Sequence, residues 1–206
     1  MGNRPIESSV NIRSLTYYDI SSVVITHLTS FPNFFLTSLG HRFLGLYYES
    51  IHEFGQIGFV AVADGRIIGF VTGIDNSFGF YRKLLRHKGV RFAIEAALAS
   101  IRRPSVALRL LRALVKRSPE EPDQTPSITL TSIAVLPGCQ ASGVGQLLEE
   151  AFESEARHRG LKRVRLETDA LDNERVLAFY RKRRYLVRRS YVTPEGRRMH
   201  EFVKDL

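Results

Sequence analysis

The stretch from Ile128 to His158 constrains the fold of this 206-residue chain more than any other segment. The run ITLTSIAV has the two-residue period of a half-buried strand, and it leads into the glycine-rich turn LPGCQASGVG. From Val144 to about His158, apolar side chains recur at helical spacing, and the pattern stops before Gly160. A strand, a glycine-rich turn and a helix in this order leave unpaired N–H groups at a positive helix end, which favours the binding of phosphate.

Three phosphate-bearing ligands suit such a turn to different degrees. For ATP, Gly138 and Gly143 have the required spacing, but Val144-Gly145 stands where Lys and Ser or Thr must reach the terminal phosphates and magnesium. For a dinucleotide, two glycines fit, but Leu148 occupies the place of the third glycine; Glu167 lies at a tolerable distance for a ribose contact and keeps this interpretation open. The third candidate is coenzyme A, whose pyrophosphate needs neither a metal nor a lysine.

The rest of the pattern predicts one domain over residues 1–206. No internal repeat is visible, and the expected order is βααββ, a helical insertion over about 77–120, then βαβαββ. Asp64-Gly65 predicts a hairpin, because this dipeptide adopts the positive φ angles of a tight turn. The elements expected besides those above are strands over 10–15, 57–63, 66–74, 162–168, 185–192 and 197–206, and helices over 17–28, 33–54 and from an Asp172 or Asn173 cap to Arg183.

Residues 81–117 hold eleven Arg and Lys residues and one acid, Glu95, a net +10 in a chain whose formal net charge is +9. The basicity therefore belongs to this segment and not to the whole fold. Apolar clusters lie among the basic residues and Pro104 interrupts them, which predicts two amphipathic helices. Three interpretations stay open: a solvated helical hairpin, a surface for anionic lipid, and a patch for a phosphate-bearing acceptor. A nucleic-acid partner is not expected, since amphipathicity combined with basic charge favours an interface helix.

Composition narrows the remaining classes of protein. No run approaches the roughly 20 apolar residues of a membrane span, and MGNRPIESSV lacks the apolar core of a signal peptide, so the cytoplasm is the expected location. A single cysteine, Cys139, excludes an internal disulfide and a Cys-rich zinc site. The six histidines show no metal-binding spacing, so we expect no metal site.

Two motifs resemble the signatures of the GNAT N-acetyltransferase superfamily. The stretch SIAVLPGCQASGVGQLL is similar to a strand ending in V-x-P followed by Q/R-x-x-G-x-G/A and a helix, with Gln140, Gly143 and Gly145 in place. The stretch LETDALDNERVLAFYRKRRYLV is similar to N-x-x-A-x-x-F-Y-x-x-x-G-F. In this second motif Val176 replaces the small Ala, and Arg184-Tyr185 replaces Gly-Phe.

The resemblance implies an α/β (α+β) fold with a mixed, mostly antiparallel central sheet flanked by helices, and it places the basic helical insertion between strands 3 and 4. It also implies acetyl-CoA as the cosubstrate. The pantetheine arm would lie along the fourth strand, the pyrophosphate would lie in the turn, and a phenol would protonate the departing thiolate. The residues so implied are Ile133, Ala134 and Val135 for the arm, Gln140, Ala141, Ser142, Gly143, Val144 and Gly145 for the pyrophosphate, Asn173 and Phe179 for further cofactor contacts, and Tyr180 as the catalytic acid.

The acceptor is less constrained. The resemblance implies acetylation of a primary amine, and we expect a small amine or amino sugar, because the basic insertion would repel Lys-rich proteins. Tyr47, Tyr48 and His41 are candidates for an acceptor cleft. No general base is assigned among the four candidates Glu167, Asp169, His27 and His41. A non-catalytic CoA-binding sensor or membrane-surface module is the alternative function, and a homodimer stays open.

Overall fold

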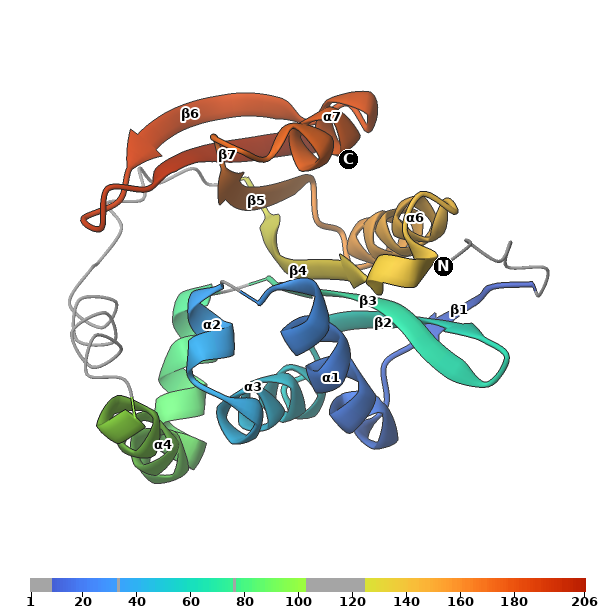
Figure 1. Cartoon of the computed structure of the whole chain (residues 1–206). Coiled ribbons are helices and arrows are strands. Elements are labelled where there is room, and N and C mark those ends of the chain that lie inside the picture. The colour runs from blue at the N-terminus through green and yellow to red at the C-terminus, as the bar shows by residue number, and fades with distance from the viewer. Residues whose placement is uncertain (1–8, 33, 76, 103–124) are drawn as a thin grey trace.

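The computed structural model describes residues 9–32, 34–75, 77–102 and 125–206. It contains one seven-stranded sheet, in the order β1-β2-β3-β4-β5-β7-β6 (Figure 1). Neighbouring strands are antiparallel except for β4 and β5, which are parallel, so the predicted mixed and mostly antiparallel sheet is confirmed. The strands are β1 (Asn11–Ser14), β2 (Ile57–Ala63), β3 (Arg66–Ile74), β4 (Ser127–Val135), β5 (Arg163–Asp169), β6 (Leu186–Val192) and β7 (Arg198–Asp205).

Helices cover both faces of the sheet and create two cores. One core packs α1 and α3 against β2 and β3, and the other packs α6 and α7 against the opposite face. Among the described helices, none is long and apolar enough to cross a bilayer. The helices are η1 (Tyr17–Asp19), α1 (Ile20–Ser30), α2 (Phe35–Ser38), α3 (His41–Glu53), α4 (Ser77–Arg102), η2 (Pro137–Cys139), α6 (Val144–His158) and α7 (Glu174–Lys182).

One predicted helical segment differs from the structure, and another is described only in part. The prediction of one helix over 33–54 is wrong, because the chain forms the separate helices α2 and α3. Gly40 stands between them with a φ of +88°, a conformation that an α-helix cannot contain. In the insertion, α4 is a continuous helix from Ser77 to Arg102; the second helix expected beyond Pro104 lies outside the described residues.

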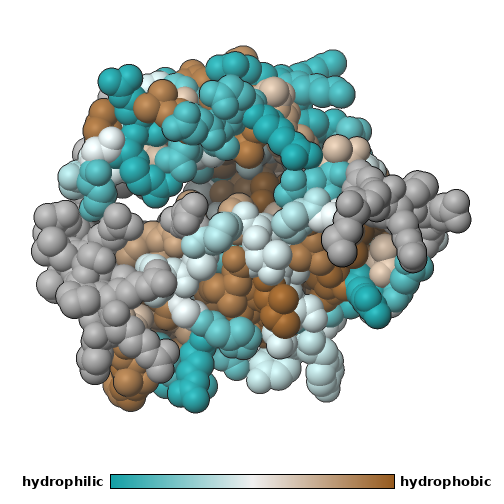
Figure 2. Space-filling view, in the orientation of Figure 1, coloured by the Kyte–Doolittle hydropathy of each residue, from teal (hydrophilic) through white to brown (hydrophobic). Residues whose placement is uncertain are grey.

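The parting of β4 from β5 is the main irregularity of the sheet. The two strands pair at three positions, from Ser127 opposite Arg163 to Thr129 opposite Arg165. Beyond them, Leu130 pairs with Gly73 and Ser132 with Thr72, so Thr131 is an extra residue in β4, a β-bulge. The bulge exchanges the faces of the strand, and after it β4 follows β3 alone. Figure 2 shows the resulting recess between the hydrophilic C-terminal strands above and the more hydrophobic half below.

Two glycines of β3 allow α6 to lie very close to the sheet. A Cβ atom placed on Gly73 would lie 2.5 Å from Cε2 of Phe152 and 2.9 Å from the carbonyl oxygen of Thr129. A Cβ atom on Gly69 would lie 3.1 Å from Cδ1 of Leu148. All three distances are shorter than ordinary contacts, so only glycine fits at these two positions without a shift of the neighbouring atoms. The seat of α6 also fixes where its first turn lies.

Gly73→Ala should therefore lower the free energy of unfolding by about 1–3 kcal/mol, because the added methyl group overpacks the contact with α6. Gly89→Ala is the matched control: Gly89 lies inside α4 with open space around its Cα, and alanine there should stabilise the protein by up to about 1 kcal/mol. Urea denaturation measures both changes. Equal stability of the Gly73→Ala variant and the wild-type protein would contradict the close seat of α6.

Candidate active site

The turn from β4 into α6 presents main-chain N–H groups without partners. The N–H of Cys139 bonds to the carbonyl oxygen of Leu136 at 2.8 Å. For the N–H groups of the next four residues, Gln140 to Gly143, the described part of the chain supplies no acceptor. The N–H groups of Val144 and Gly145 belong to the first turn of α6, where a helix has no acceptor of its own, and the N–H of Gln146 already bonds the carbonyl oxygen of Gly143 at 3.0 Å. The turn therefore gathers hydrogen-bond donors at the positive end of a helix.

The two glycines at the start of α6 leave space around the main chain. Gly143 is the N-cap residue of α6 with a φ of +82°, and a Cβ on it would meet no atom within 4 Å. A Cβ on Gly145 would make only ordinary contacts, 3.7 Å from the ring of Phe179 and 3.9 Å from Cγ2 of Val135. Packing within the protein therefore does not require glycine at Gly145, and a ligand can approach the main chain there. The donor set and the space both fit a diphosphate.

The end of β4 lies beside this turn. The N–H of Leu136 donates to the carbonyl oxygen of Ile68 at 2.8 Å, and main-chain groups alternate along an antiparallel pair, so those of Ile133 and Val135 face away from β3. The carbonyl oxygen of Val135 accepts hydrogen bonds from Gln140 Nε2 at 3.2 Å and from Ser30 Oγ at 3.4 Å. Ala134 lies between Ile133 and Val135 and is buried in the core that contains α1 and α3. The main chain at the end of β4 thus lines the gap that opens where β4 and β5 no longer pair.

Gln140 links three elements, which the motif alone did not show. While its Nε2 donates to the end of β4, its Oε1 accepts a hydrogen bond from Nη1 of Arg175 at 3.0 Å. Arg175 lies in the first turn of α7, so Gln140 joins the turn to β4 and to α7. Sequence reasoning missed Arg175. A cation in the first turn of a helix opposes the helix dipole, and this unusual placement could have identified it as a candidate.

Asn173 occupies the N-cap position of α7, but its side chain does not cap the helix. Its Nδ2 donates to Oγ1 of Thr168 at 2.8 Å and to the carbonyl oxygen of Asp169 at 2.9 Å. The predicted N-cap position is confirmed at Asn173, although the side chain makes no capping hydrogen bond. The amide nitrogen of Asn173 instead ties the start of α7 to the end of β5, and a contact with a cofactor would fall to its Oδ1.

Tyr180 lies on the buried face of α7. Its ring packs against Phe179, Tyr185 and Phe202, with centroid distances of 5.3, 5.4 and 5.7 Å. Tyr180 belongs to the core cluster that contains Val144 and against which Ile133 and Val135 pack, so its ring lies in the core on the face of the sheet that α6 covers. Burial raises the pKa of Tyr180, and the charge of Glu149 adds to the effect. The phenol therefore stays protonated at neutral pH, as a general acid must.

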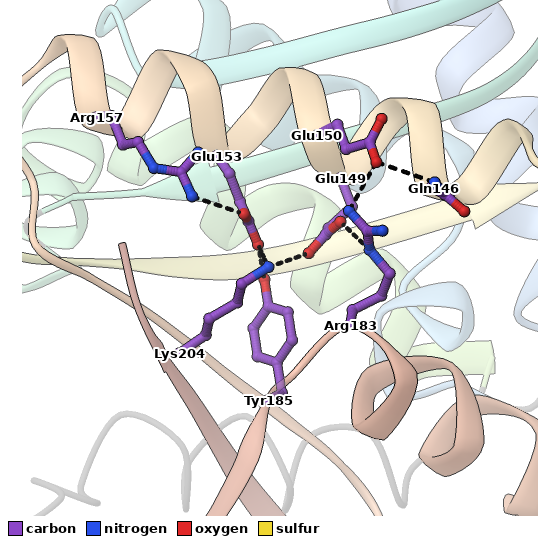
Figure 3. A network of polar contacts seen from close by, with 8 residues as sticks. All are labelled: Gln146, Glu149, Glu150, Glu153, Arg157, Arg183, Tyr185 and Lys204. Atoms are coloured by element: carbon purple, nitrogen blue, oxygen red, sulfur yellow. Dashed lines mark hydrogen bonds and ion pairs between the residues drawn. The ribbon is translucent and has the colours of Figure 1, made fainter.

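A buried ion network joins α6 to the C-terminal elements (Figure 3). Glu149 and Glu153 lie one turn apart on α6, and both are almost completely buried. Lys204 of β7 reaches both carboxylates, at 3.2 Å from Glu149, and Arg183 at the end of α7 bonds Glu149 at 2.6 Å. Tyr185 donates its hydroxyl to Glu153 at 3.2 Å. Sequence reasoning missed this network, which ties α6 to β7 and to the residues that follow α7.

The residues suggested for an acceptor cleft lie elsewhere. Tyr47 and Tyr48 are buried in the core, and the hydroxyl of Tyr48 contacts Nδ1 of His27 at 2.7 Å. His41 lines a groove between α1, α3 and α4. Burial lowers the pKa of His27 to about 4, so this imidazole is neutral at physiological pH. The expectation that Tyr47 and Tyr48 line an open cleft is wrong, since their side chains fill the core.

Glu167 and Asp169, the two acidic candidates for a general base, lie on β5. Asp169 at the end of β5 is held by a bidentate ion pair with Arg197, at 2.7 and 2.8 Å. Glu167 is half-exposed, and its Oε1 lies 4.0 Å from Nη2 of Arg189. Of the two carboxylates, Glu167 therefore has the weaker tie to a neighbouring cation.

Comparisons with known proteins agree with this architecture. A family model described as the acetyltransferase (GNAT) family matches residues 24–185. No curated protein sequence matches the chain. At identities of 13–15%, similarity to solved structures establishes a shared fold.

Three of the similar structures illustrate that fold. Ribosomal-protein-alanine N-acetyltransferase from Brucella melitensis has 15% identity and a TM-score of 0.64, with 95% of this chain and 99% of that chain covered. Polyamine N-acetyltransferase from Drosophila melanogaster, which forms N-acetylagmatine, has 15% identity and a TM-score of 0.62, with 96% and 100% covered. The Salmonella typhimurium protein yncA, solved with its cofactor acetyl-CoA, has 13% identity and a TM-score of 0.60, with 96% and 94% covered.

Lys204→Met should destabilise the protein by about 3–5 kcal/mol at neutral pH, because it leaves two buried carboxylates without their shared cation. Burial raises the pKa of Glu149 to about 7, and Glu153 adds to this effect. A raised carboxyl pKa means that the native state gains stability as the pH falls, so the deficit should shrink between pH 7 and pH 5. Lys182→Met, at an exposed position on α7, is the control. Thermal melting across pH tests the prediction, and a deficit independent of pH would contradict it.

Proposed function

The chain belongs to the acetyltransferase (GNAT) family, and from this premise we propose that it transfers an acetyl group from acetyl-CoA to a primary amine. One observation carries the proposal: within the described residues the N–H groups of Gln140 to Gly143 have no acceptor, and this turn directly follows the part of β4 that no longer pairs with β5. The diphosphate of the cosubstrate would accept hydrogen bonds from the residues of this turn, Gln140 to Gly145. The main chain of Ile133 and Val135 would bond the pantetheine arm.

Other phosphate ligands fit this site less well. An ATP site needs a lysine and a hydroxyl at the start of α6, and Val144 and Gly145 stand there. A dinucleotide site needs a glycine at Leu148, but this side chain is fully buried against the sheet. The similar structure yncA was solved with acetyl-CoA, which supports the choice of cosubstrate.

The proposed reaction is a direct transfer. The uncharged amine attacks the thioester carbonyl carbon, the C–S bond breaks, and the sulfur leaves with a proton supplied by the hydroxyl of Tyr180. Burial favours the protonated phenol before transfer, and a phenolate formed there regains its proton from solvent. No side chain is assigned to remove the amine proton, and a water chain can serve.

The acceptor that we propose is a small amine or amino sugar. The described part of the insertion supports this choice, because the exposed side chains of Arg82, Lys83, Arg86 and Arg91 on α4 disfavour the approach of a Lys-rich protein. Similar structures act on a polyamine and on a ribosomal protein, so both kinds of acceptor occur on this fold. A thiol-release assay across amino sugars, amino acids, polyamines and peptide N-termini would identify the acceptor. Release with none of them would favour a non-catalytic sensor that binds coenzyme A.

Tyr180→Phe should lower turnover by about 100-fold or more while leaving the dissociation constant of acetyl-CoA within about twofold, since the hydroxyl acts on the leaving thiolate. Tyr18→Phe removes an exposed hydroxyl from η1, outside this aromatic cluster, and is the control, expected to keep most of the turnover. Thiol-release kinetics and calorimetry provide the two readouts. Unchanged turnover in the Tyr180→Phe variant would remove this residue from the mechanism.

We further propose that α4 contacts anionic membranes. Its outer surface exposes large apolar side chains beside its cations, and Figure 2 shows hydrophobic atoms of α4 at the lower left. Apolar area and positive charge together favour binding to an anionic membrane surface. Around α4 the two kinds of side chain are mixed and do not form two separate faces. The exposed large apolar residues of α4 are Tyr81, Leu85, Val90, Ile94 and Leu98.

The full-length protein should therefore sediment with phosphatidylserine vesicles at low salt and not with neutral phosphatidylcholine vesicles. Reversing three charges, with Arg82→Glu, Lys83→Glu and Arg86→Glu together, should abolish the binding, because the electrostatic attraction contributes about 1 kcal/mol per basic residue. Absence of binding by the wild-type protein, or full binding by the triple variant, would refute this proposal.

A further inference from the structure

Arg175 lies beside the turn from β4 into α6, and none of the described acidic residues pairs with it. Its side chain is exposed, and within the described residues its one assigned bond is from Nη1 to Oε1 of Gln140 at 3.0 Å. Other arginines near the site have carboxylate partners: Arg183 bonds Glu149 and Glu150, and Arg197 bonds Asp169. A guanidinium group has five N–H donors, so four stay available at Arg175.

Arg175 adds positive charge to a region whose main chain already has a positive potential. It lies in the first turn of α7, where the helix dipole is positive and where Glu174 is the acidic residue. Through Gln140 it also lies next to the turn that opens α6, whose donors and dipole are positive as well. Two helix starts and one guanidinium group thus direct positive potential to the same edge of the gap. A bound anion would compensate all three.

Gln140 restricts where the guanidinium group can lie. Its Nε2 is committed to the carbonyl oxygen of Val135 at 3.2 Å, which leaves Oε1 turned toward α7 to accept from Arg175. The amide of Gln140 therefore holds the guanidinium group beside the turn. An exposed arginine without such a tether would lose more side-chain entropy on binding a ligand.

We propose that Arg175 binds a phosphate group of the coenzyme A moiety, which rests on the proposed function. The bond is a charge-assisted hydrogen bond from the guanidinium group to a phosphate oxygen, added to the main-chain bonds of the turn. Two phosphates have this chemistry, the diphosphate held by the turn and the 3′-phosphate of the ribose. Gln140 is then a positioning residue for Arg175.

Calorimetry with free coenzyme A tests the proposal on the full-length protein. Arg175→Gln should weaken binding by about tenfold or more, since a charge-assisted hydrogen bond is lost. Arg175→Lys should recover part of the affinity, because it retains the charge but not the planar fork. Arg181→Gln is the matched control: Arg181 is exposed on the same helix near its other end and should bind like the wild-type protein.

Dephospho-coenzyme A, which lacks the 3′-phosphate, distinguishes the two sources. Equal loss with both ligands on Arg175→Gln assigns the contact to the diphosphate, and loss with coenzyme A alone assigns it to the 3′-phosphate. Unchanged affinity of Arg175→Gln, or an equal loss in Arg181→Gln, would overturn the proposal while the proposed function stands. If the wild-type protein bound neither ligand, the proposed function itself would fail. Thermal melting of each variant checks that the fold is retained.

Discussion

The parting of β4 from β5 is the constraint on which the rest of the site depends. Three paired positions hold the two strands at their beginnings, and the bulge at Thr131 then directs β4 along β3 alone. Main-chain groups that would normally bond to a neighbouring strand are left facing a gap, and buried polar groups need partners. Because α6 begins just after β4 ends, the donors of the turn lie at the mouth of the same gap.

A divided sheet needs another means of holding its halves together. The helix α6 lies on the N-terminal half through the glycines of β3, and the buried carboxylates Glu149 and Glu153 connect it to β7 and α7. Taking these charges out of water is costly, and the bonds from Lys204, Arg183 and Tyr185 offset that cost. Aromatic packing of Tyr180, Tyr185 and Phe202 fills the remaining space. The helix α6, which follows the glycine-rich turn, is thereby fixed to both parts of the sheet.

Most local elements could be predicted, because short-range patterns determine them. The hairpin at Asp64-Gly65 follows from two positive φ angles, and α6 begins at Val144 and ends at His158 as its apolar spacing indicated. The failure at residues 33–54 has a local cause as well: the apolar spacing continued through Gly40, and its positive φ was not anticipated. Motif reasoning identified the turn but not its supports, because Gln140 meets Arg175 35 positions away and Glu149 meets Lys204 55 positions away.

The sequence by itself determined the strand-turn-helix unit that can bind a diphosphate, since backbone donors, glycines and helix polarity are properties of consecutive residues. Only the tertiary structure decided the rest. It inserted β7 between β5 and β6, opened the gap beside β4, and brought Arg175 of α7 to Gln140 of the turn. Strand order and contacts between residues far apart in the sequence depend on how distant segments pack. A pattern of neighbouring residues does not indicate which distant segments will pair.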